Sequence, residues 1–175
     1  PFASGTRLVV TGNPVREEIL ALASEGGERE GLLIFGGSLG AGFLNRVVCE
    51  AVPELVRAFP GLRVRHVAGI RDAGWVAAQY AAAGTAVDVQ PFLSDMRTAY
   101  REASVVVCRA GGNTLAEVLA LGKASILVPY PLAMDDHQKA NALQAAQRGA
   151  AVMVEERELT PARLAAEASR LLGDT

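Results

Sequence analysis

The sequence predicts an α/β fold, a Rossmann-like doubly wound parallel sheet formed by one domain of 175 residues. Apolar runs alternate with segments of helical periodicity along nearly the whole chain. Several of these runs, such as LLIF, SVVVC and SILV, are continuously apolar, which is typical of parallel strands covered on both faces. Strands that each lead into a helix are expected to wind right-handedly into one sheet.

The same patterns place the elements along the chain. Strands are expected at residues 7–10, 31–35, 63–68, 86–90, 104–108, 124–128 and 151–154. Helices are expected at residues 14–23, 41–59, 73–83, 94–102, 114–121, 137–148 and 161–172. Ligands of such sheets bind beyond the carboxyl ends of the strands, so the informative residues should lie in strand-to-helix loops.

Capping signals support several helix ends. Asn13 and Thr160 each precede a proline, which places a capping side chain before a proline at the first helical position. Thr114 and Glu117 have the spacing of a capping box. Glycines are expected to end four helices, at Gly84, Gly122, Gly149 and Gly173.

Composition and charge exclude several classes of protein. Half of the residues are hydrophobic and 21% are charged, which excludes a disordered chain. The net charge of −2 and the absence of a Lys/Arg stripe argue against binding to nucleic acid. No run approaches the roughly 20 apolar residues of a membrane span. Cys49 and Cys108 lie in apolar runs, so we expect buried, reduced thiols in a cytoplasmic protein.

The amino terminus, PFASGTRLVV, lacks the layout of a signal peptide. It leads almost directly into a predicted strand, as expected of a domain taken from a longer chain.

A glycine-rich loop follows the second predicted strand, with the sequence FGGSLGA at residues 35–41. Glycines such as Gly37 let the backbone approach a ligand, and the following helix start attracts a phosphate. Ser38 can add a hydroxyl donor. The loop matches neither the dinucleotide fingerprint nor a P-loop, and the alternative is a plain strand–helix turn.

A second loop, CRAGGNTLAE at residues 108–117, again follows a strand. Glu117, one turn into the helix, has the position of a carboxylate that accepts two hydrogen bonds from a ribose diol. Alternatively, it reaches back and caps Thr114. The adjacent glycines, Gly111 and Gly112, favour a ligand that approaches closely.

Two further segments carry weaker signals. Arg16, in GNPVR at residues 12–16, opposes the helix dipole unless an anion lies nearby. The alternative is an exposed arginine paired with Glu17 or Glu18. In PFLSDM at residues 91–96, Phe92 and Met96 could flank a flat base or simply pack in the core.

The loop PYPLAMDDHQ, at residues 129–138, is stiffened by prolines and ends in hydrogen-bonding side chains, as a sugar site requires. Asp135 and Asp136 could bind a metal, but caps are the favoured interpretation. His137 could be a base or a ligand, although an exposed histidine at a helix start explains it as well. His66 lies within a strand and is expected to be structural.

Together these segments resemble one family. GNPVR, GGSLGA, PFLSDM, CRAGGNTLAE and DDHQKANA, in this order, are similar to the carboxy-terminal domain of MurG-type transferases. The resemblance implies a GT-B glycosyltransferase that moves N-acetylglucosamine from UDP onto undecaprenyl-linked muramyl-pentapeptide, converting lipid I to lipid II with inversion. It also implies a cytoplasmic protein, peripheral on the inner face of the membrane.

The resemblance implies roles for the matching residues. Arg16, Ser38 and the neighbouring glycines, Gly37 among them, would hold the diphosphate. Glu117 would accept the ribose hydroxyls.

The remaining roles concern the base and the sugar. Phe92 would cap the uracil, the Leu93 backbone would read its edge, and Met96 would pack nearby. The sugar and phosphate would be lined by Gly112, Asn113 and Thr114, with Gln138 on the acetamido sugar. His137 stands where other members often have a glutamine, and Gly112 and Asn113 fall where members vary.

The implied partners are UDP-N-acetylglucosamine and an amino-terminal domain that carries the lipid-linked acceptor and the general base. No metal or cofactor is implied in this domain, so the chain is expected to bind the donor without catalysing transfer. Three alternatives stay open: the donor-binding subunit of a split two-subunit transferase, a non-catalytic UDP-sugar-binding module, and a UDP-sugar epimerase.

Overall fold

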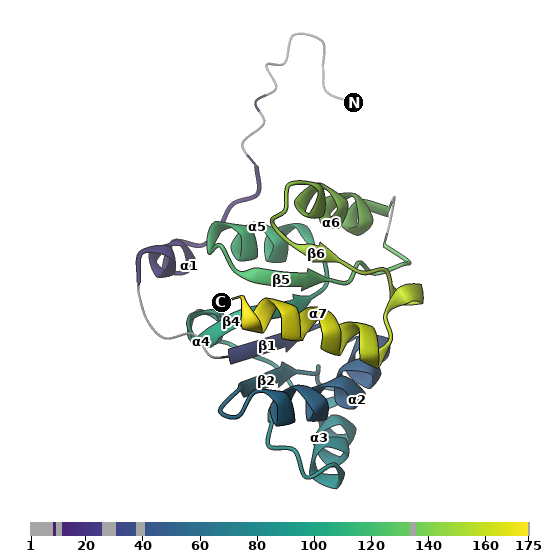
Figure 1. Cartoon of the computed structure of the whole chain (residues 1–175). Helices are drawn as coiled ribbons and strands as arrows, with labels where there is room; N and C mark the ends of the chain where they lie inside the picture. The colour runs from purple at the N-terminus through teal and green to yellow at the C-terminus, as the bar shows by residue number, and fades with distance from the viewer. Residues whose placement is uncertain (1–8, 10–11, 26–30, 38–40, 134–135, 175) are drawn as a thin grey trace.

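A computed structural model describes residues 9, 12–25, 31–37, 41–133 and 136–174. Its centre is a six-stranded sheet in which every neighbouring pair is parallel, in the order β3-β2-β1-β4-β5-β6 (Figure 1). The strands are β1 (Gly31–Phe35), β2 (Arg63–Val67), β3 (Asp88–Gln90), β4 (Ala103–Cys108), β5 (Ala124–Leu127) and β6 (Val152–Met153). The predicted doubly wound parallel sheet is therefore confirmed.

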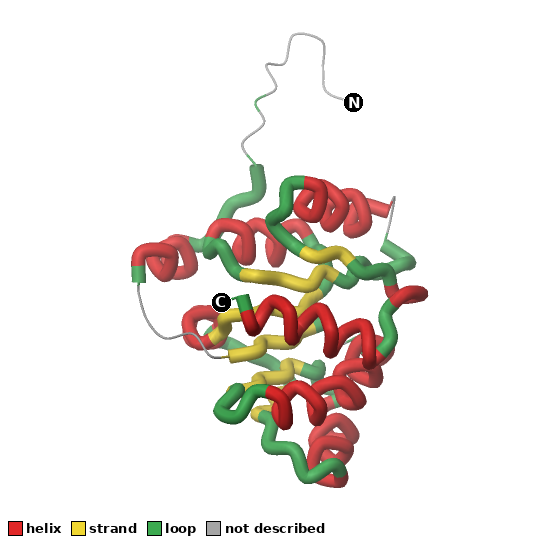
Figure 2. The backbone as a smooth tube through the Cα atoms, viewed as in Figure 1, coloured by secondary structure: helices red, strands yellow, loops and turns green. Residues whose placement is uncertain are grey.

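Helices cover both faces of the sheet (Figure 2). One face packs against α2 (Gly42–Ala58), α3 (Ala73–Ala82) and α7 (Pro161–Gly173). The other packs against α1 (Glu17–Leu20), η1 (Ala21–Ser24), α4 (Met96–Glu102), α5 (Gly112–Ala120) and α6 (His137–Gln147). A short 3-10 turn, η3 (Glu156–Glu158), precedes α7. Among the described helices, none is both long and apolar enough to cross a membrane.

The continuous apolar strands divide their side chains between two cores. In β1, Leu32 and Ile34 point to the core beneath α2, α3 and α7, whereas Leu33 and Phe35 point to the other core. All five residues of β1 and all six of β4 are buried. Since alternate residues of a strand face opposite ways, a strand covered on both sides must be apolar throughout, as these are.

Several predicted boundaries hold. Six of the seven predicted strands are present, and the strand expected at residues 7–10 lies outside the described residues except for Val9. The Thr160 side chain accepts a hydrogen bond of 3.1 Å from the Arg163 amide, which confirms that cap. Three glycines take positive φ angles just after helices, as predicted, at Gly84, Gly122 and Gly149. Both cysteines are buried and free.

Other boundaries were wrong. The helix expected from residue 14 begins at Glu17 and has no side-chain cap, because Asn13 lies against α5 instead. The helix expected from Thr114 begins at Gly112, so Thr114 and Glu117 form no capping box. Gly173 is the last helical residue of α7 and does not follow it.

The predicted structural role of His66 is confirmed by a buried polar network. Its Nδ1 lies 3.0 Å from the Tyr80 hydroxyl and its Nε2 lies 3.0 Å from Asn45 Oδ1. The Asn45 amide donates to the Ala68 carbonyl and to Asp72 Oδ2, so Oδ1 is left to accept from a neutral imidazole. Burial lowers the pKa of His66 to about 4, which keeps the ring uncharged.

Candidate functional site

The direction of winding reverses between β1 and β4, and the ends of these strands meet there. Phe35 pairs with Cys108 at the carboxyl edge of the sheet, so the two glycine-containing loops leave side by side. In sheets of this order, the crevice at this switch point is the ligand site. The predicted phosphate and ribose loops therefore lie next to each other.

The first loop requires glycine at two positions. Gly37 has a φ of +100°, a conformation that other residues rarely adopt. A Cβ on Gly36 would lie 2.2 Å from the Ala41 side chain, so only glycine fits. The loop leads into the 17-residue helix α2, whose start has no side-chain cap and no acidic residue in its first turn. This helix start can attract an anion. The predicted Ser38 lies outside the described residues.

Glu117 is held by two partners from distant parts of the chain. Its Oε1 accepts hydrogen bonds from Arg16 Nη2 (2.9 Å) and Nε (3.1 Å). Its Oε2 accepts one of 3.1 Å from the Tyr100 hydroxyl. The Glu117 side chain is 13% exposed and that of Arg16 is 47% exposed. The second contact of Arg16, 3.7 Å to Glu18, bears out the surface pair weighed from the sequence, although Glu117 is the closer partner.

Tyr100 was missed by the sequence analysis. It is fully buried on α4 and lies edge-on to Phe35 of β1. Burial and the neighbouring Glu117 raise the pKa of Tyr100, so its hydroxyl remains a donor. A buried helical tyrosine has no distinguishing signal in sequence, because its partner is defined only by tertiary packing.

The segment before α1 also reaches the second loop. A Cβ on Gly112 would lie 2.7 Å from the Asn13 amide nitrogen, so this glycine permits the close approach of residues 12–16. Asn113 is exposed, and Thr114 is half-buried in the first turn of α5. Residues 12–16 and the loop at residues 108–117 thus meet at the amino end of α5.

The loop after β3 combines one exposed and two packed side chains. Phe92 is 60% exposed, as a platform for a flat group would be. Leu93 and Met96 pack against the core beneath α4 and α5, so core packing accounts for their side chains. Asp95 caps α4 through the amides of Arg97 and Thr98.

The loop after β5 is fixed by Gln138. The Tyr130 amide donates a hydrogen bond of 3.0 Å to Gln138 Oε1, joining the start of the loop to the first turn of α6. Asp136 precedes α6 with a φ of 52° and makes no side-chain cap, contrary to expectation. Asp135 lies outside the described residues, and His137 is exposed.

No group of three or more potential ligands (His, Cys, Asp or Glu) that could hold a metal ion occurs among the described residues.

Arg109 is a second functional candidate that sequence reasoning passed over. It follows β4 directly and is buried, with its guanidinium paired to Glu156. Its Nη1 donates to the carbonyls of Val128 (3.2 Å) and Pro129 (3.3 Å). The same guanidinium lies 5.4 Å from the centre of the Tyr130 ring. Its sequence position at a strand end was a signal, but its partners lie 19 or more residues away.

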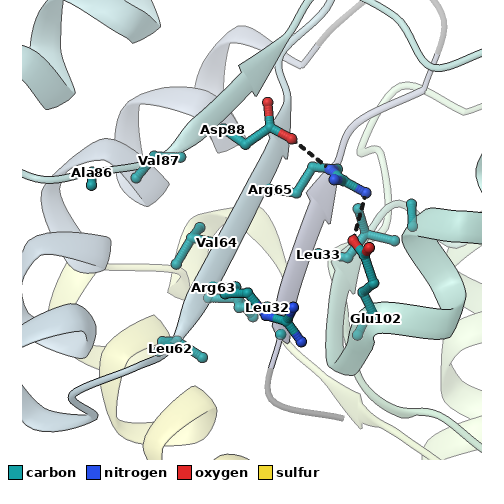
Figure 3. A pocket seen from close by; sticks show the side chains of 13 residues that line it. Leu32, Leu33, Leu62, Arg63, Val64, Arg65, Ala86, Val87, Asp88 and Glu102 are labelled. Atoms are coloured by element: carbon teal, nitrogen blue, oxygen red, sulfur yellow. Dashed lines mark hydrogen bonds and ion pairs between the residues drawn. The ribbon is translucent and has the colours of Figure 1, made fainter. Parts of the chain in front are cut away.

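A hollow of about 510 Å³ lies elsewhere, at the amino ends of β1, β2 and β4. Figure 3 shows Arg65 of β2 reaching Asp88 on one side and Glu102 on the other. Those ion pairs measure 2.6 and 3.0 Å, and the remaining lining is mostly aliphatic. Because its charges neutralise one another and it faces away from the switch point, this hollow lacks the features of the ligand site.

The sheet order and the loops at its carboxyl edge define a class, the Rossmann-like domain of GT-B glycosyltransferases. The chain belongs to glycosyltransferase family 28: residues 31–174 match the Glycosyltransferase family 28 C-terminal domain.

Curated relatives bear the name UDP-N-acetylglucosamine--N-acetylmuramyl-(pentapeptide) pyrophosphoryl-undecaprenol N-acetylglucosamine transferase. The protein from Geotalea daltonii is 44% identical over 98% of this chain and 48% of its own length. That from Aeromonas hydrophila is 47% identical, with the same shares covered. The chain thus spans about half the length of the curated relatives it matches.

Solved structures agree with this membership. MurG from Acinetobacter baumannii matches with a TM-score of 0.74 and 35% identity, over 88% of this chain and 44% of that one. A putative UDP-N-acetylglucosamine 2-epimerase from Listeria monocytogenes matches with a TM-score of 0.61 at 15% identity, over 91% of this chain and 40% of that one. At that identity, the second likeness concerns the fold alone.

Proposed function

We propose that this chain binds UDP-N-acetylglucosamine as the donor half of an inverting glycosyltransferase that converts lipid I to lipid II. The observation that carries the proposal is the Glu117 carboxylate, held by Arg16 and Tyr100 beside the glycine loop at the switch point. Membership of family 28 and the names of the relatives support the choice of donor and acceptor.

Glu117 is the proposed ribose ligand. A carboxylate accepts two hydrogen bonds from a vicinal diol, and its oxygens are already oriented by two separate donors. The exposed Arg16 can turn from Glu117 to the diphosphate, because its guanidinium is half in solvent. Binding would then replace the two charge-assisted hydrogen bonds that Arg16 donates to Glu117 with two from the ribose.

The diphosphate would lie between the glycine loop and Arg16. The uncapped start of α2 and the open backbone at Gly37 present positive potential where the UDP leaving group develops charge. Ser38 would add a hydroxyl. These groups act electrostatically, so the proposed chemistry in this domain requires no metal.

The uracil would stack on the exposed ring of Phe92, with the Leu93 backbone at its edge and Met96 beneath. The sugar would extend toward α5 and α6. Gly112, Asn113 and Thr114 would line one side of it, and His137 and Gln138 the other.

Residues 1–175 would form the donor-binding domain, and an amino-terminal domain would supply the lipid-linked acceptor and the general base. Peripheral attachment to the inner face of the membrane would also depend on that other half. This chain alone is therefore expected to bind the donor and not to transfer the sugar.

Calorimetric titration with UDP-N-acetylglucosamine, UDP and ADP tests the proposal. We expect the uridine nucleotides to bind more tightly than ADP. Glu117→Ala should weaken both uridine complexes by about tenfold or more, since hydrogen bonds to a charged group contribute about 1.5–3 kcal/mol. Glu167→Ala, which removes an acid on α7 that pairs with nearby Arg163 and Arg170, serves as the matched control.

Equal affinity for ADP would contradict the uridine site. A folded Glu117→Ala variant that binds the uridine nucleotides as tightly as the unaltered chain would contradict the assignment of Glu117 as the ribose ligand.

A further inference from the structure

Arg109 is buried although it carries a permanent charge. Its side chain is 9% exposed, and its guanidinium contacts the segments that follow β5 and β6. Among the described residues, its Nε is buried without a hydrogen-bond partner. Burying a guanidinium with one unsatisfied N–H is costly, so its remaining partners must offset that cost.

The contacts of Arg109 join three neighbouring strand ends. The residue itself extends β4, its Nη1 holds the two carbonyls that follow β5, and its Nη2 pairs with Glu156 after β6. A second tie runs alongside, because the Asn141 amide of α6 donates to the Ala110 carbonyl at 3.2 Å. The forked guanidinium therefore sets the spacing of three loops at the carboxyl edge.

One of these loops leads to the sugar end of the proposed site. The Arg109 guanidinium lies against the Tyr130 ring, and the Tyr130 amide binds Gln138 Oε1. A backbone N–H can only donate, so the oxygen of the Gln138 amide must point inward. Its Nε2, which carries two hydrogens, is consequently directed away from the Tyr130 amide as a donor.

We propose that the Arg109–Glu156 pair positions the part of the site that binds the sugar. It holds the Tyr130 loop so that Gln138 presents a hydrogen-bond donor to an acceptor oxygen of the N-acetylated sugar. The pair touches neither the nucleotide nor the sugar; it acts through Tyr130. This inference rests on the proposed function and adds the residues that set preference for the sugar-bearing nucleotide over UDP.

The test compares two ligands across three variants of the whole chain. Arg109→Met keeps an aliphatic side chain and removes the guanidinium. Glu156→Gln removes the negative charge of the partner with little change in shape. Arg157→Met is the matched control, since Arg157 lies in the same loop and pairs with Glu155 and Glu158 at the surface. Calorimetry gives the dissociation constants of UDP-N-acetylglucosamine and UDP for each protein.

We expect Arg109→Met and Glu156→Gln to weaken UDP-N-acetylglucosamine binding by about three- to tenfold, the worth of one hydrogen bond. UDP binding should stay within about twofold, because the Arg16–Glu117 end of the site is untouched. Arg157→Met should change neither. If Arg109→Met fails to fold, Glu156→Gln carries the test alone.

A parallel loss of both ligands would overturn the inference, since it would indicate a general structural role. So would an unchanged ratio of the two affinities in folded variants, or equal affinity of the unaltered chain for both ligands. In each of those outcomes the unaltered chain still binds UDP, whereas an unaltered chain that binds neither ligand would contradict the proposed function itself.

Discussion

Two arginine–carboxylate pairs lie at the same edge of the sheet and differ in almost every physical respect. Arg16 and Glu117 meet at 2.9 Å with the arginine half in solvent, and Arg16 has a second acid, Glu18, within 3.7 Å. Arg109 and Glu156 meet beneath Tyr130, where the arginine also serves two carbonyls. The first arginine can change partners at little cost, and the second cannot.

The difference follows from solvation. Water replaces the partner of an exposed guanidinium, so such pairs contribute little to stability and suit a group that must turn toward an arriving anion. A buried guanidinium that loses its partner stays desolvated and unpaired. We therefore assign ligand exchange to the exposed pair and geometric support to the buried pair.

Breaking the buried pair is expected to have the largest effect on the free energy of unfolding. Arg109→Met should lower the free energy of unfolding by about 3 kcal/mol, because it leaves Glu156 and two buried carbonyls without their donor. Urea denaturation followed by circular dichroism measures this change. A decrease in the free energy of unfolding of less than about 1 kcal/mol would mean that the buried pair contributes no more to stability than an exposed pair does.

Acid sensitivity of the fold is expected at His66, a buried group outside both pairs. The pKa of His66 is lowered by burial to about 4 in the folded chain, against about 6.5 when unfolded. The unfolded state thus binds the proton more readily. The associated stability, about 3 kcal/mol, is present above pH 6.5 and is lost as the pH falls toward 4.

Urea midpoints measured from pH 7.5 to 4 should follow that slope in the unaltered chain. The glutamine of His66→Gln cannot titrate. That variant should be less stable at neutral pH, but its stability should depend less on pH over the same range. An equally steep decline in that variant would assign the acid response to other groups.

The smallest expected effect on stability is at the exposed pair. Arg16→Met should change the free energy of unfolding by less than about 1 kcal/mol, as for most surface ion pairs. The same variant should weaken UDP binding measurably, since it removes the cation proposed for the diphosphate. Denaturation and calorimetry on one preparation check both statements, and a large loss of stability would contradict the assignment.

Sequence alone predicted the layers and most elements of this fold. Continuous apolar runs such as LLIF and SVVVC identify strands covered on both faces, and their alternation with helices leaves one common topology. It also placed the informative residues in strand-to-helix loops, because ligands of such sheets bind beyond the carboxyl ends of the strands. Those inferences depend on local pattern and on general rules of chain winding.

What sequence could not predict depends on contacts between distant residues. Glu117 was weighed as a cap for Thr114, but it binds Arg16, which lies 101 positions away. Asn13 was expected to cap its own helix, yet it lies against Gly112. In both cases a local preference of about 1 kcal/mol was outweighed by a tertiary contact. Arg109 and Tyr100 were passed over because burial of a polar group is visible only in three dimensions.

The position of α7 has a consequence for how the chain is made. Residues 161–173 return across the sheet and cover α2, which forms directly after the first described strand (Figure 1). Until those residues have left the ribosome, the part of α2 that packs against α7 has no cover. Synthesis at about 5–20 residues per second leaves that surface open for several seconds, a period in which the nascent chain is exposed to aggregation.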